Sequence, residues 1–555
     1  MNHLPHDMSP LIDMTQSLRV GPIRSSQPAY VDLLPPCNHA CPAGEDIQGW
    51  LALAQTGKFR EAWQHLIRNN PLPAVHGRVC YHPCESACNR GELDSAVSIH
   101  AVERFLGDRA IAENWPLPEN ATSSGKRVLV VGAGPSGLSA AFHLARLGHQ
   151  VEIHEAGPLP GGMLHFGIPA YRLPRDVLMQ EIARIETMGV TIILDHKVED
   201  LLAEQATGKF DAVFVAIGTQ IGKRIGIPER DAPRVIDAIT LLHEVETGSP
   251  PLLGRRVIVY GGGNTAIDAA RTARRLGAEE TLIVYRRDRA HMPAQAFEAA
   301  EALSEGIKIR WLSTITEIDG GELTVETMRL DDQGQPQPTG RLETLSADSV
   351  VLALGQQTES GFLKKVPGIA FTTDGSLVVD SGLMTGHPGI FAGGDMVPGE
   401  RTVTVAVGHG KKAARHVDAW LRGQTWQVAA QHPVVRFEQI KLPIYSDAPR
   451  SVQRELPLEQ RLDRGFEETM GSLSEAEAHY EAQRCLSCGN CFECDNCYAA
   501  CPESAIVKLG PTHGYRVNMD LCTGCAVCVE QCPCHAMEMV PEAAPQFANA
   551  MESAK

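Results

Sequence analysis

The spacing of hydrophobic residues separates a helical N-terminal part of the chain from a strand-rich centre. Between residues 47 and 67 the apolar positions recur every three or four residues, which predicts helices. These positions are Ile47, Trp50, Leu51, Ala54, Phe59, Trp63, Leu66 and Ile67. From residue 127 onward the apolar residues form short continuous runs, as buried parallel strands do. Residues 1–36 show neither pattern and contain several prolines, so we expect a surface arm.

One apolar run, Arg127–Val131, leads into a glycine-rich turn with the spacing G-x-G-x-x-G at Gly132, Gly134 and Gly137. Such glycines let backbone amides approach a pyrophosphate at the start of the following helix. The next run ends in Glu155, an acid at the distance that reaches a pair of ribose hydroxyls. This combination predicts a dinucleotide-binding fold.

A second fingerprint follows the run Val257–Tyr260 and has the variant spacing G-x-G-x-x-A, beginning at Gly261 and Gly263. The strand after it ends in Arg286 and Arg287 instead of an acid. A carboxylate there would bind the 2′-hydroxyl of NAD, whereas arginines suit a 2′-phosphate. We therefore predict NADP(H), and NAD(H) remains possible if both arginines face solvent.

Near its C-terminal end the chain carries two copies of the pattern C-x2-C-x2-C-x3-C-P. In two-cluster ferredoxins each copy gives three thiolates to one [4Fe–4S] cluster, and its fourth cysteine binds the other cluster. The first predicted cluster has the ligands Cys491, Cys494, Cys497 and Cys532, and the second has Cys522, Cys525, Cys528 and Cys501. Structural zinc and disulfides are the alternatives, but a zinc site closes with four ligands and does not require interleaved runs.

Composition restricts the class of protein further. A chain of 555 residues is long enough for three or four domains. Its net charge of −17 argues against nucleic acid or an anionic membrane as the partner. We find no apolar run long enough for a transmembrane helix and no secretory signal pattern. The 16 cysteines in motif spacing favour a reducing compartment and metal binding, so we expect a cytoplasmic protein.

The N-terminal cysteine region resembles the iron–sulfur domain of the glutamate synthase small subunit family. Dihydropyrimidine dehydrogenase and the large subunit of the transhydrogenase Nfn are relatives in this family. The resemblance is carried by residues 70–80 and by Val102-Glu103-Arg104-Phe105. Family members have an R-C-x-x-C-G element just before their first C-x3-C pair. In this chain that element lies some 400 residues later, at 484–489, just before the ferredoxin pattern.

The resemblance implies two further [4Fe–4S] clusters, which makes four in the chain. One would have the ligands Cys37, Cys88, Cys485 and Cys488. The other would have the ligands Cys41, Cys80 and Cys84, with Glu103 as the fourth. Cys534 would then remain without a cluster. The alternative leaves Cys485 and Cys488 as free thiols and gives the N-terminal region one cluster.

Segments at 161–164, 168–174, 213–219 and 389–395 resemble the flavin-binding parts of the same family. The implied FAD site comprises Gly132, Gly134, Pro135, Ser136, Gly137, Glu155, Gly162, Met163, Leu164, Gly218, Gly394 and Asp395. The implied NAD(P)H site comprises Gly261, Gly263, Asn264, Thr265, Asp268, Arg286 and Arg287. No redox C-x-x-C lies near the flavin segments, so electrons would leave through iron–sulfur clusters. Hydride transfer between nicotinamide and flavin needs no side-chain acid or base, and we assign none.

These patterns predict an α/β protein with tandem Rossmann-like domains, as in the disulfide reductases, between a helical iron–sulfur domain and a C-terminal α+β ferredoxin domain. The expected divisions are an arm (1–36), the helical [4Fe–4S] domain (37–120), the FAD domain in two parts (121–250 and 346–430), the NAD(P)H domain (251–345), a linker (431–484), the ferredoxin-like domain (485–540) and a tail (541–555).

The chain has no segment resembling a thiamine diphosphate domain, a glutaminase or an FMN barrel, so we expect a hetero-oligomer whose carbon chemistry lies on another subunit. The leading hypothesis is the electron-transfer subunit of a thiamine diphosphate-type 2-oxoacid oxidoreductase, reducing NAD(P)+. The appended ferredoxin pattern favours it. Alternatives are the NADPH-oxidising small subunit of glutamate synthase, beside its large subunit, and a ferredoxin:NAD(P) oxidoreductase, which could bifurcate electrons. A non-enzymatic ferredoxin-like carrier or scaffold is the last alternative.

Overall fold

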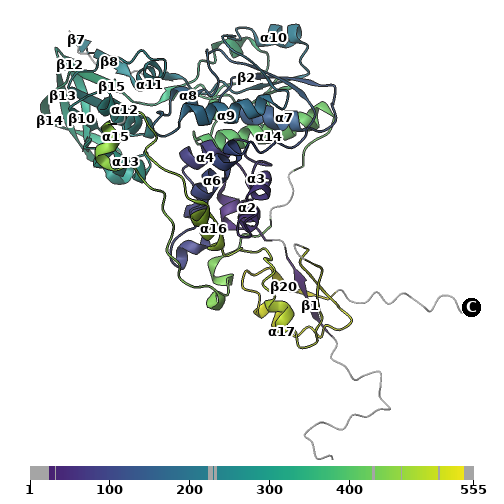
Figure 1. The fold of residues 1–555 in the computed structure, drawn as a ribbon. Helices are drawn as coiled ribbons and strands as arrows, with labels where there is room; N and C mark the ends of the chain where they lie inside the picture. Colours follow the sequence, from purple (N-terminus) through teal and green to yellow (C-terminus); the bar gives the residue numbers. More distant parts are fainter. Residues whose placement is uncertain are drawn as a thin grey trace, which may run out of the picture. The chain divides into compact units, whose positions relative to one another are not determined.

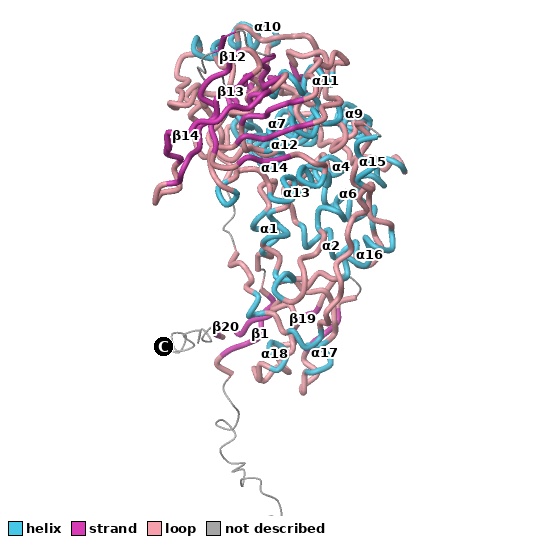
Figure 2. Tube along the Cα trace, turned by 90° about the vertical axis from the view of Figure 1, so that its left-hand side faces the viewer, coloured by secondary structure: helices cyan, strands magenta, loops and turns pink. Residues whose placement is uncertain are grey.

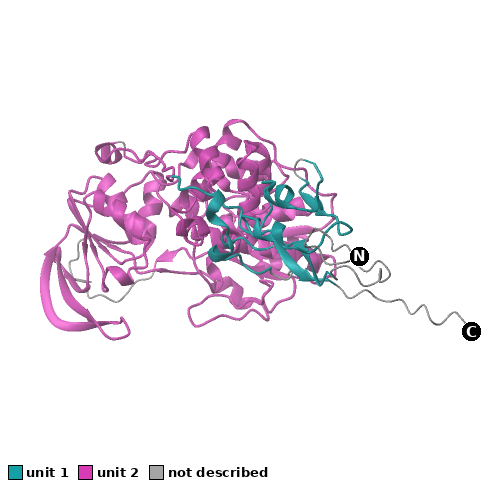
Figure 3. Ribbon diagram, turned by 90° about the horizontal axis from the view of Figure 1, so that it is seen from below, with its two compact units in different colours: residues 1–36, 430–448, 486–555 teal, residues 37–429, 449–485 magenta. Residues whose placement is uncertain are grey.

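The computed structural model describes residues 24–31, 33–222, 229–230, 234–427, 432–463, 465–510 and 513–542. They form two compact units, shown in different colours in Figure 3. The larger unit takes its residues from 37–429 and 449–485, and the smaller takes its residues from 1–36, 430–448 and 486–555. We describe each unit by itself. Among the described residues, no helix combines the length and the apolar character needed to cross a bilayer.

The larger unit begins with a helical domain whose core is built from the periodic apolar residues. Its helices are α1 (Pro36–Ala40), α2 (Ile47–Ala54), α3 (Phe59–Leu66), α4 (Pro73–Val79), α5 (Pro83–Ser86) and α6 (Ile99–Ala112). Trp50 and Trp63 are buried in this core, as the helical spacing predicts. Helix α16 (Glu475–Gln483) packs against α2 and α6, although it lies more than 350 residues later in the chain. Its predicted capping box is present, since Ser474 and Glu477 bond each other's backbone.

The first nucleotide-binding sheet is parallel and has the strand order β17-β5-β2-β3-β4. Its strands are β2 (Arg127–Val131), β3 (Gln150–His154), β4 (Thr191–Ile193), β5 (Ala212–Val215) and β17 (Ile390–Ala392). Helices α7 (Pro135–Arg146), α9 (Arg175–Glu186) and α14 (Val403–Leu421) lie beside it (Figure 1). Their apolar residues share one buried core with the strands. The short helices α8 (Met163–Phe166) and α10 (Leu201–Gly208) follow β3 and β4. Because β17 joins from far along the chain, this domain is discontinuous.

The second nucleotide-binding sheet, inserted between the two parts of the first domain, is also parallel, in the order β11-β10-β9-β15-β8. Its strands are β8 (Arg234–Asp237), β9 (Arg256–Tyr260), β10 (Glu280–Val284), β11 (Lys308–Arg310) and β15 (Ser349–Leu352). Its helices are α11 (Ala238–Glu246), α12 (Asn264–Arg275) and α13 (Ala296–Ser304).

A smaller sheet of four strands extends the second domain, in the order β14-β13-β12-β7. Its strands are β7 (Glu229–Arg230), β12 (Ser313–Asp319), β13 (Glu322–Leu330) and β14 (Pro336–Ser346), and Figure 2 shows the long hairpin of the last two. Strands β6 (Ile221–Gly222) and β16 (Gln356–Gln357) pair antiparallel where the chain passes between the two domains. Helix α15 (Leu458–Asp463) precedes α16 in the returning segment.

The smaller unit contains the ferredoxin-type pattern and a strand that the sequence did not suggest. Its elements are β18 (Ile506–Lys508), β19 (Tyr515–Val517), α17 (Asn496–Ala500), α18 (Val527–Glu530) and β20 (Met537–Pro541). Strand β1 (Ser26–Tyr30) pairs antiparallel with β20. Arg24 adds an ion pair to Glu542 and hydrogen bonds to the carbonyls of Met519 and Cys522. Part of the expected surface arm is therefore a strand, and residues 1–23 of that arm and 543–555 of the expected tail lie outside the described residues.

Candidate functional site

A cavity of about 470 Å³ in the larger unit is lined by residues of both glycine fingerprints. From the first fingerprint and its acid come Gly132, Gly134, Pro135, Ser136 and Glu155, and from the second come Gly263, Asn264, Thr265 and Asp268. Gly162, Met163, Leu164, Gly218, Gly394 and Asp395, all predicted from the flavin-like segments, also line it. Two motifs more than 120 residues apart thus share one cavity.

The first fingerprint needs its glycines for measurable reasons. Gly132 has φ +103°, and a Cβ there would lie 2.6 Å from the carbonyl oxygen of Ala216. A Cβ on Gly137 would lie 2.0 Å from the carbonyl oxygen of Gly132, because helix α7 starts directly against the turn. Nothing lies within 4 Å of a Cβ on Gly134, so this position leaves open space facing the cavity. The hydroxyl of Ser136 is buried with no hydrogen-bond partner in the described chain. It can therefore donate a hydrogen bond to a pyrophosphate oxygen.

Two backbone amides hold the carboxylate of Glu155 in place. Its Oε2 accepts from the N–H of Ala133 at 2.7 Å, and its Oε1 accepts from the N–H of Gly157 at 2.8 Å. Each carboxylate oxygen has a second acceptor site, which remains for a ribose hydroxyl. The residues of this fingerprint therefore fit the adenosine half of a dinucleotide.

Asp395 lies at the cavity wall after strand β17. Burial raises the pKa of this carboxyl group, although the charge of Arg401 and the hydroxyl of Thr219 act in the opposite direction. The backbone N–H of its neighbour Gly394 donates to Nδ1 of His409 at 3.2 Å. The second flavin-like segment therefore places a partly charge-compensated carboxylate against the cavity, as the family pattern implies.

The second fingerprint is arranged differently. Gly261 has φ +149°, and a Cβ there would lie 2.2 Å from the carbonyl oxygen of Ala353, so this glycine serves the turn and does not line the cavity. The side chain of Asn264 connects Gln295 to Tyr81. Its Oδ1 accepts from the N–H of Gln295 at 2.8 Å, and its Nδ2 donates to the hydroxyl of Tyr81 at 2.7 Å.

Asp268, predicted to bind the cofactor, lines the cavity but already has a partner. Both of its oxygens lie 2.8 Å from Nη1 of Arg172, whose guanidinium also contacts the buried carboxylate of Glu298. The role we infer for Asp268 is to hold Arg172 at the cavity wall.

Arg286 and Arg287 follow strand β10 but are not among the residues that line the cavity. Arg286 is exposed, and Arg287 is half-buried with its Nε donating to the hydroxyl of Tyr285 at 3.1 Å. They stand at the carboxyl end of the strand beside the fingerprint strand, where Rossmann folds read the 2′ substituent. Their contact with a 2′-phosphate stays a prediction.

Other residues at the cavity were missed by sequence reasoning. Tyr81, Arg172 and Thr402 all line it. Tyr81 directly follows Cys80, and Arg172 lies within the flavin-like segment at 168–174, so both had a local signal that was not used. Thr402 had none, because helix α14, which it caps by accepting from the N–H of Val405, shows only ordinary helical spacing.

The predicted N-terminal ligands Cys37, Cys41, Cys80 and Cys84 lie close enough that their charges act on one another. Burial raises the pKa of Cys80 to about 12, and the charge of Glu103 adds to this, while hydrogen bonds from Thr404 and the N–H of His82 oppose it. A thiol with so high a pKa becomes a thiolate when a metal ion replaces the proton on its sulfur, so buried, grouped thiols of this kind fit an iron–sulfur cluster. All the described cysteines are free of disulfides.

Glu103 lies beside this group, on helix α6. Its side chain is buried, burial raises its pKa, and its charge acts on both Cys41 and Cys80. Nδ2 of Asn70 donates to its Oε1 at 2.7 Å and to Oε1 of Glu45 at 3.0 Å. The position suits the fourth ligand implied by the family pattern, and the assignment itself stays a prediction.

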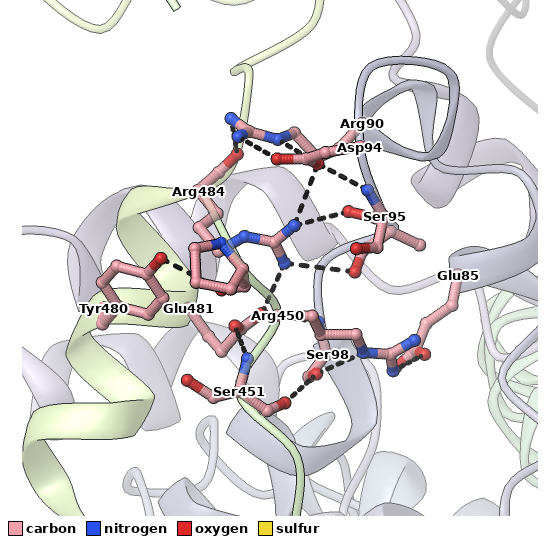
Figure 4. Close-up of polar contacts among 12 residues, drawn as sticks. Glu85, Arg90, Asp94, Ser95, Ser98, Arg450, Ser451, Tyr480, Glu481 and Arg484 are labelled. Atoms are coloured by element: carbon pink, nitrogen blue, oxygen red, sulfur yellow. Dashed lines mark hydrogen bonds and ion pairs between the residues drawn. The ribbon is translucent and has the colours of Figure 1, made fainter. Parts of the chain in front are cut away.

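The R-C-x-x-C element begins on the helical domain, where Cys485 and Cys88 both pack against its core. Figure 4 shows how the preceding residue, Arg484, is held. Its guanidinium forms ion pairs of 3.0 Å with Asp94 and Glu481, and its side chain is 2% exposed. Nη1 of Arg90 donates to the carbonyl oxygen of Arg484 at 3.2 Å. This network fixes Cys485 to the domain that carries Cys37 and Cys88.

The returning segment makes further contacts in the same network. Arg450 donates to the hydroxyl of Ser98 at 2.6 Å and pairs with Glu85, while the N–H of Ser98 donates to Glu481 at 2.9 Å (Figure 4). Cys488 belongs to the smaller unit, where it is buried with Leu486 and neighbouring apolar residues. Binding of Cys488 to the cluster predicted for Cys37, Cys88 and Cys485 therefore stays a prediction.

In the smaller unit, the four cysteines predicted for one ferredoxin cluster surround a single small space. Cys501, Cys522, Cys525 and Cys528 line it, together with apolar residues that include Ile506 and Val517. For the other cluster, the charges of Cys532 and Cys497 act on Cys494 and Cys491, and the hydroxyl of Tyr30 lies 3.3 Å from Sγ of Cys497. Both sets fit [4Fe–4S] clusters.

Cys534 is the cysteine that the predicted cluster sets leave over. Its side chain is buried, and its Sγ lies 3.9 Å from Sγ of Cys532. The charges of Cys491 and Cys494 also act on it. It therefore lies beside cysteines predicted to bind the first ferredoxin cluster.

Comparison with family models and known proteins supports this arrangement. Residues 126–410 match the pyridine nucleotide-disulphide oxidoreductase model, residues 33–115 match dihydropyrimidine dehydrogenase domain II with its 4Fe-4S cluster, and residues 490–536 match a 4Fe-4S dicluster domain. The chain is 36% identical to the NADP(+)-dependent formate dehydrogenase subunit beta of Moorella thermoacetica, over 82% of this chain and 70% of that protein.

Two further relatives are similar over most of their length. The NADPH-Fe(3+) oxidoreductase subunit beta of Geobacter sulfurreducens is 34% identical over 82% of this chain and 75% of its own. The glutamate synthase [NADPH] small chain of Escherichia coli is 32% identical over 70% of this chain and 89% of its own. Among solved structures, Mycobacterium tuberculosis FprA in complex with NADPH aligns with a TM-score of 0.47 and 19% identity, over 54% of this chain and 85% of that one.

These findings confirm the predicted resemblance and the predicted fold class, with nucleotide-binding domains followed by a ferredoxin-type module. The first family model spans more than half of the chain, and the dihydropyrimidine dehydrogenase model matches the helical domain. The chain therefore belongs to the pyridine nucleotide-disulphide oxidoreductases, in the group that includes the glutamate synthase small chain and carries 4Fe-4S domains.

Proposed function

We propose that this chain is an electron-transfer subunit that moves electrons between four [4Fe–4S] clusters, FAD and NADP(H). The observation that carries the proposal is the position of Cys80. Its neighbours Val79 and Tyr81 line the nucleotide cavity, and its Sγ accepts a hydrogen bond of 3.0 Å from Thr404 in helix α14. A cluster held by Cys80 would therefore stand at the wall of the cavity that would hold the flavin.

When bound, FAD exchanges a hydride with the nicotinamide and single electrons with the iron–sulfur clusters. The chain's own residues bind the two nucleotide cofactors and orient them. The fingerprint glycines admit the pyrophosphates, Glu155 holds a ribose, and the arginines after β10 select the 2′-phosphate. Asn264 ties the start of helix α12 to Tyr81, so the nicotinamide side and the Cys80 loop are positioned by one hydrogen bond.

Occupancy can be tested on anaerobically purified, fully loaded protein. We expect about 16 iron atoms and one FAD per chain, since each of four clusters holds four irons. About eight irons would leave only the ferredoxin clusters and would contradict the N-terminal assignments. Replacing Cys485 and Cys488 by serine should remove one cluster and leave the ferredoxin signals unchanged; loss of those signals instead would overturn the division of ligands.

For the partner we propose a catalytic subunit whose carbon chemistry releases electrons, in a cytoplasmic hetero-oligomer. A 2-oxoacid oxidoreductase of the thiamine diphosphate type is the first candidate, because the ferredoxin module would accept its low-potential electrons. The names of the relatives support a second candidate, a formate dehydrogenase or glutamate synthase large subunit.

Native anaerobic purification with mass spectrometry of every co-purifying chain distinguishes these candidates. Thiamine diphosphate-type subunits would support the first candidate, and a formate dehydrogenase or amidotransferase subunit would support the second. Recovery of the chain alone would contradict the hetero-oligomer and indicate a reductase for diffusible ferredoxin. Bleaching of the flavin by NADPH tests the enzymatic role itself, and a flavin that stays oxidised would point to a carrier.

A further inference from the structure

Near the carboxyl end of the first sheet, two histidines and a glutamate direct their ligand atoms at one point. His154 ends strand β3, His196 follows β4, and Glu204 lies in helix α10. Nδ1 of His154 and Nε2 of His196 each lie 3.1 Å from Oε1 of Glu204. All three ligand atoms lie within 4.8 Å of one another. They come from three separate elements, so this convergence is a product of the fold.

One ring nitrogen of the buried His154 faces this point without a hydrogen bond. Its side chain is 4% exposed, and its Nε2 lies 2.9 Å from Oε1 of Glu152, an acceptor that keeps the ring proton on Nε2. Nδ1 then points a lone pair toward Glu204, and it has no hydrogen-bond partner among the described residues. A lone pair on Nδ1 facing a carboxylate oxygen is repulsive, and a cation between the two atoms, either a proton or a metal ion, removes the repulsion. A carboxylate behind the histidine is also the usual support of a metal-binding imidazole.

The distances suit a small divalent transition metal. Bonds of about 2.0–2.1 Å to nitrogen and oxygen arranged in a tetrahedron give edges of about 3.3 Å between ligand atoms. The two edges of 3.1 Å observed here are close to this value. Imidazole nitrogens with one carboxylate form a donor set typical of zinc. The side chains of Glu204 and His196 are 27% and 41% exposed, which leaves a fourth position for water.

The two other groups of this kind in the described chain differ. In the group of His82, Glu85 and His100, the carboxylate already pairs with the guanidinium of Arg450. In the group of Glu45, His76 and Glu103, both carboxylates accept from the amide of Asn70 beside the predicted cluster ligands. In His154, one ring nitrogen contacts the carboxylate of Glu152 and the other faces the proposed site. Neither of the other groups has a histidine oriented by a carboxylate in this way.

We propose that His154, His196 and Glu204 bind one zinc-type divalent metal ion, with Glu152 orienting His154. Arg127 lies 3.3 Å from the other oxygen of Glu152 and fixes that carboxylate in turn. His154 and His196 also line the nucleotide cavity, so the ion lies on its rim, beside Glu155.

The test uses the cluster- and flavin-loaded chain, kept anaerobic, treated with chelator and dialysed against buffered Zn²⁺ in excess Mg²⁺. Zinc per flavin is measured by mass spectrometry, and we expect one tightly bound zinc per chain. His196→Gln and Glu204→Gln should each weaken binding at least 100-fold. Glu152→Gln should weaken it about 10- to 100-fold, as loss of such a supporting carboxylate does. His387→Gln, at a surface histidine outside the site, is the matched control and should bind as the unmodified chain does.

Iron and flavin content, measured on every variant, show whether it is folded. X-ray absorption spectra at the zinc edge, recorded on the loaded chain, should show nitrogen and oxygen neighbours at about 2.0–2.1 Å and no sulfur. Equal binding by the unmodified chain, His196→Gln and Glu204→Gln would mean an adventitious ion only. Sulfur neighbours would place the zinc on cysteines. Either result, or no tight binding at all, overturns the proposal.

Discussion

The two nucleotide-binding domains of this chain share a strand arrangement and differ where each would read its ribose. After β3, two backbone amides hold Glu155, whose residue is 8% exposed. After β10, Arg286 is exposed and Arg287 makes one hydrogen bond to a tyrosine. A carboxylate that binds a neutral diol gains from being fixed in advance, whereas cations that bind a phosphate gain from their charge and keep freedom of movement.

The third position of each fingerprint differs as well. Gly137 has no room for a Cβ, because the carbonyl oxygen of Gly132 would lie 2.0 Å from it. The second domain carries Ala266 at the corresponding place, fully buried in its core. Helix α7 therefore starts closer to its turn than α12 does, and the flavin-side fold is the less tolerant of the two.

The largest effect on cofactor binding is expected from exchanging the residue types at the third fingerprint position, Gly137 and Ala266. Gly137→Ala should abolish flavin binding, because the methyl group forces α7 away from the turn that receives the pyrophosphate. Ala266→Gly is the matched change in the second domain and should keep one flavin per chain. Flavin absorbance per polypeptide after gel filtration measures both. A Gly137→Ala chain that retains full flavin would show that the two helices start alike.

A second prediction concerns the buried ion cluster of the nicotinamide-side domain. Arg271 and Arg275 both pair with Glu305, and these three side chains are at most 1% exposed. Glu305→Gln leaves two buried cations under-compensated and should cost about 3–5 kcal/mol. Glu279→Gln, at an exposed pair with Arg255, should cost much less, because solvent already screens that pair. Hydrogen exchange of α12 and α13 measures both, and equal protection in the two variants would contradict the prediction.

The same ion cluster predicts that the second nucleotide-binding domain loses stability at acidic pH. Burial alone would raise the pKa of Glu305, but the hydrogen bonds and charges of Arg275 and Arg271 lower it to about 2. A folded pKa below the unfolded value of about 4.3 gives stability that is complete above pH ~4.3 and is lost as pH falls toward about 2. Exchange of α12 should therefore accelerate in this window in the unmodified chain and should not change there in Glu305→Gln.

Changes at the arginines sharpen the comparison at the 2′ position. Replacing both Arg286 and Arg287 by alanine should raise the KM for NADPH about 10- to 100-fold, since hydrogen bonds to charged groups contribute about 1.5–3 kcal/mol. The KM for NADH should stay within about twofold, because NADH has no 2′-phosphate for these arginines to bind. Arg255→Ala, an exposed arginine beside the same sheet, is the control. An unchanged ratio of the two KM values would show that the arginines face solvent during catalysis.

The smallest effect is expected at the fixed acid. Glu155→Gln keeps the shape but turns an amide NH2 toward one of two backbone N–H donors, so flavin affinity should fall about tenfold through the loss of about 1–2 kcal/mol. Equilibrium dialysis of flavin measures it. A loss as large as that of Gly137→Ala would mean that Glu155 supports the fold itself.

Sequence reasoning succeeded where the signal was local. The strands before Gly132 and Gly261 and the spacing of the ferredoxin cysteines each lie within a few tens of residues, and the structure groups them accordingly. It did not anticipate partners that only the tertiary fold supplies. Arg172 holds Asp268 from 96 residues away, and Glu45 shares an amide with Glu103. Nothing in the periodicity of either segment records such a pairing.

The pairing of β1 with β20 has a consequence for the order of events during synthesis. Some 500 residues separate the two strands, so at about 5–20 residues per second the first strand waits roughly 25–100 s for its partner to leave the ribosome. The nucleotide-binding domains emerge and can fold in that interval. The smaller unit, with Tyr30 against Cys497, closes only after nearly the whole chain has been made. Iron loading of the ferredoxin sites is therefore expected to follow translation rather than accompany it.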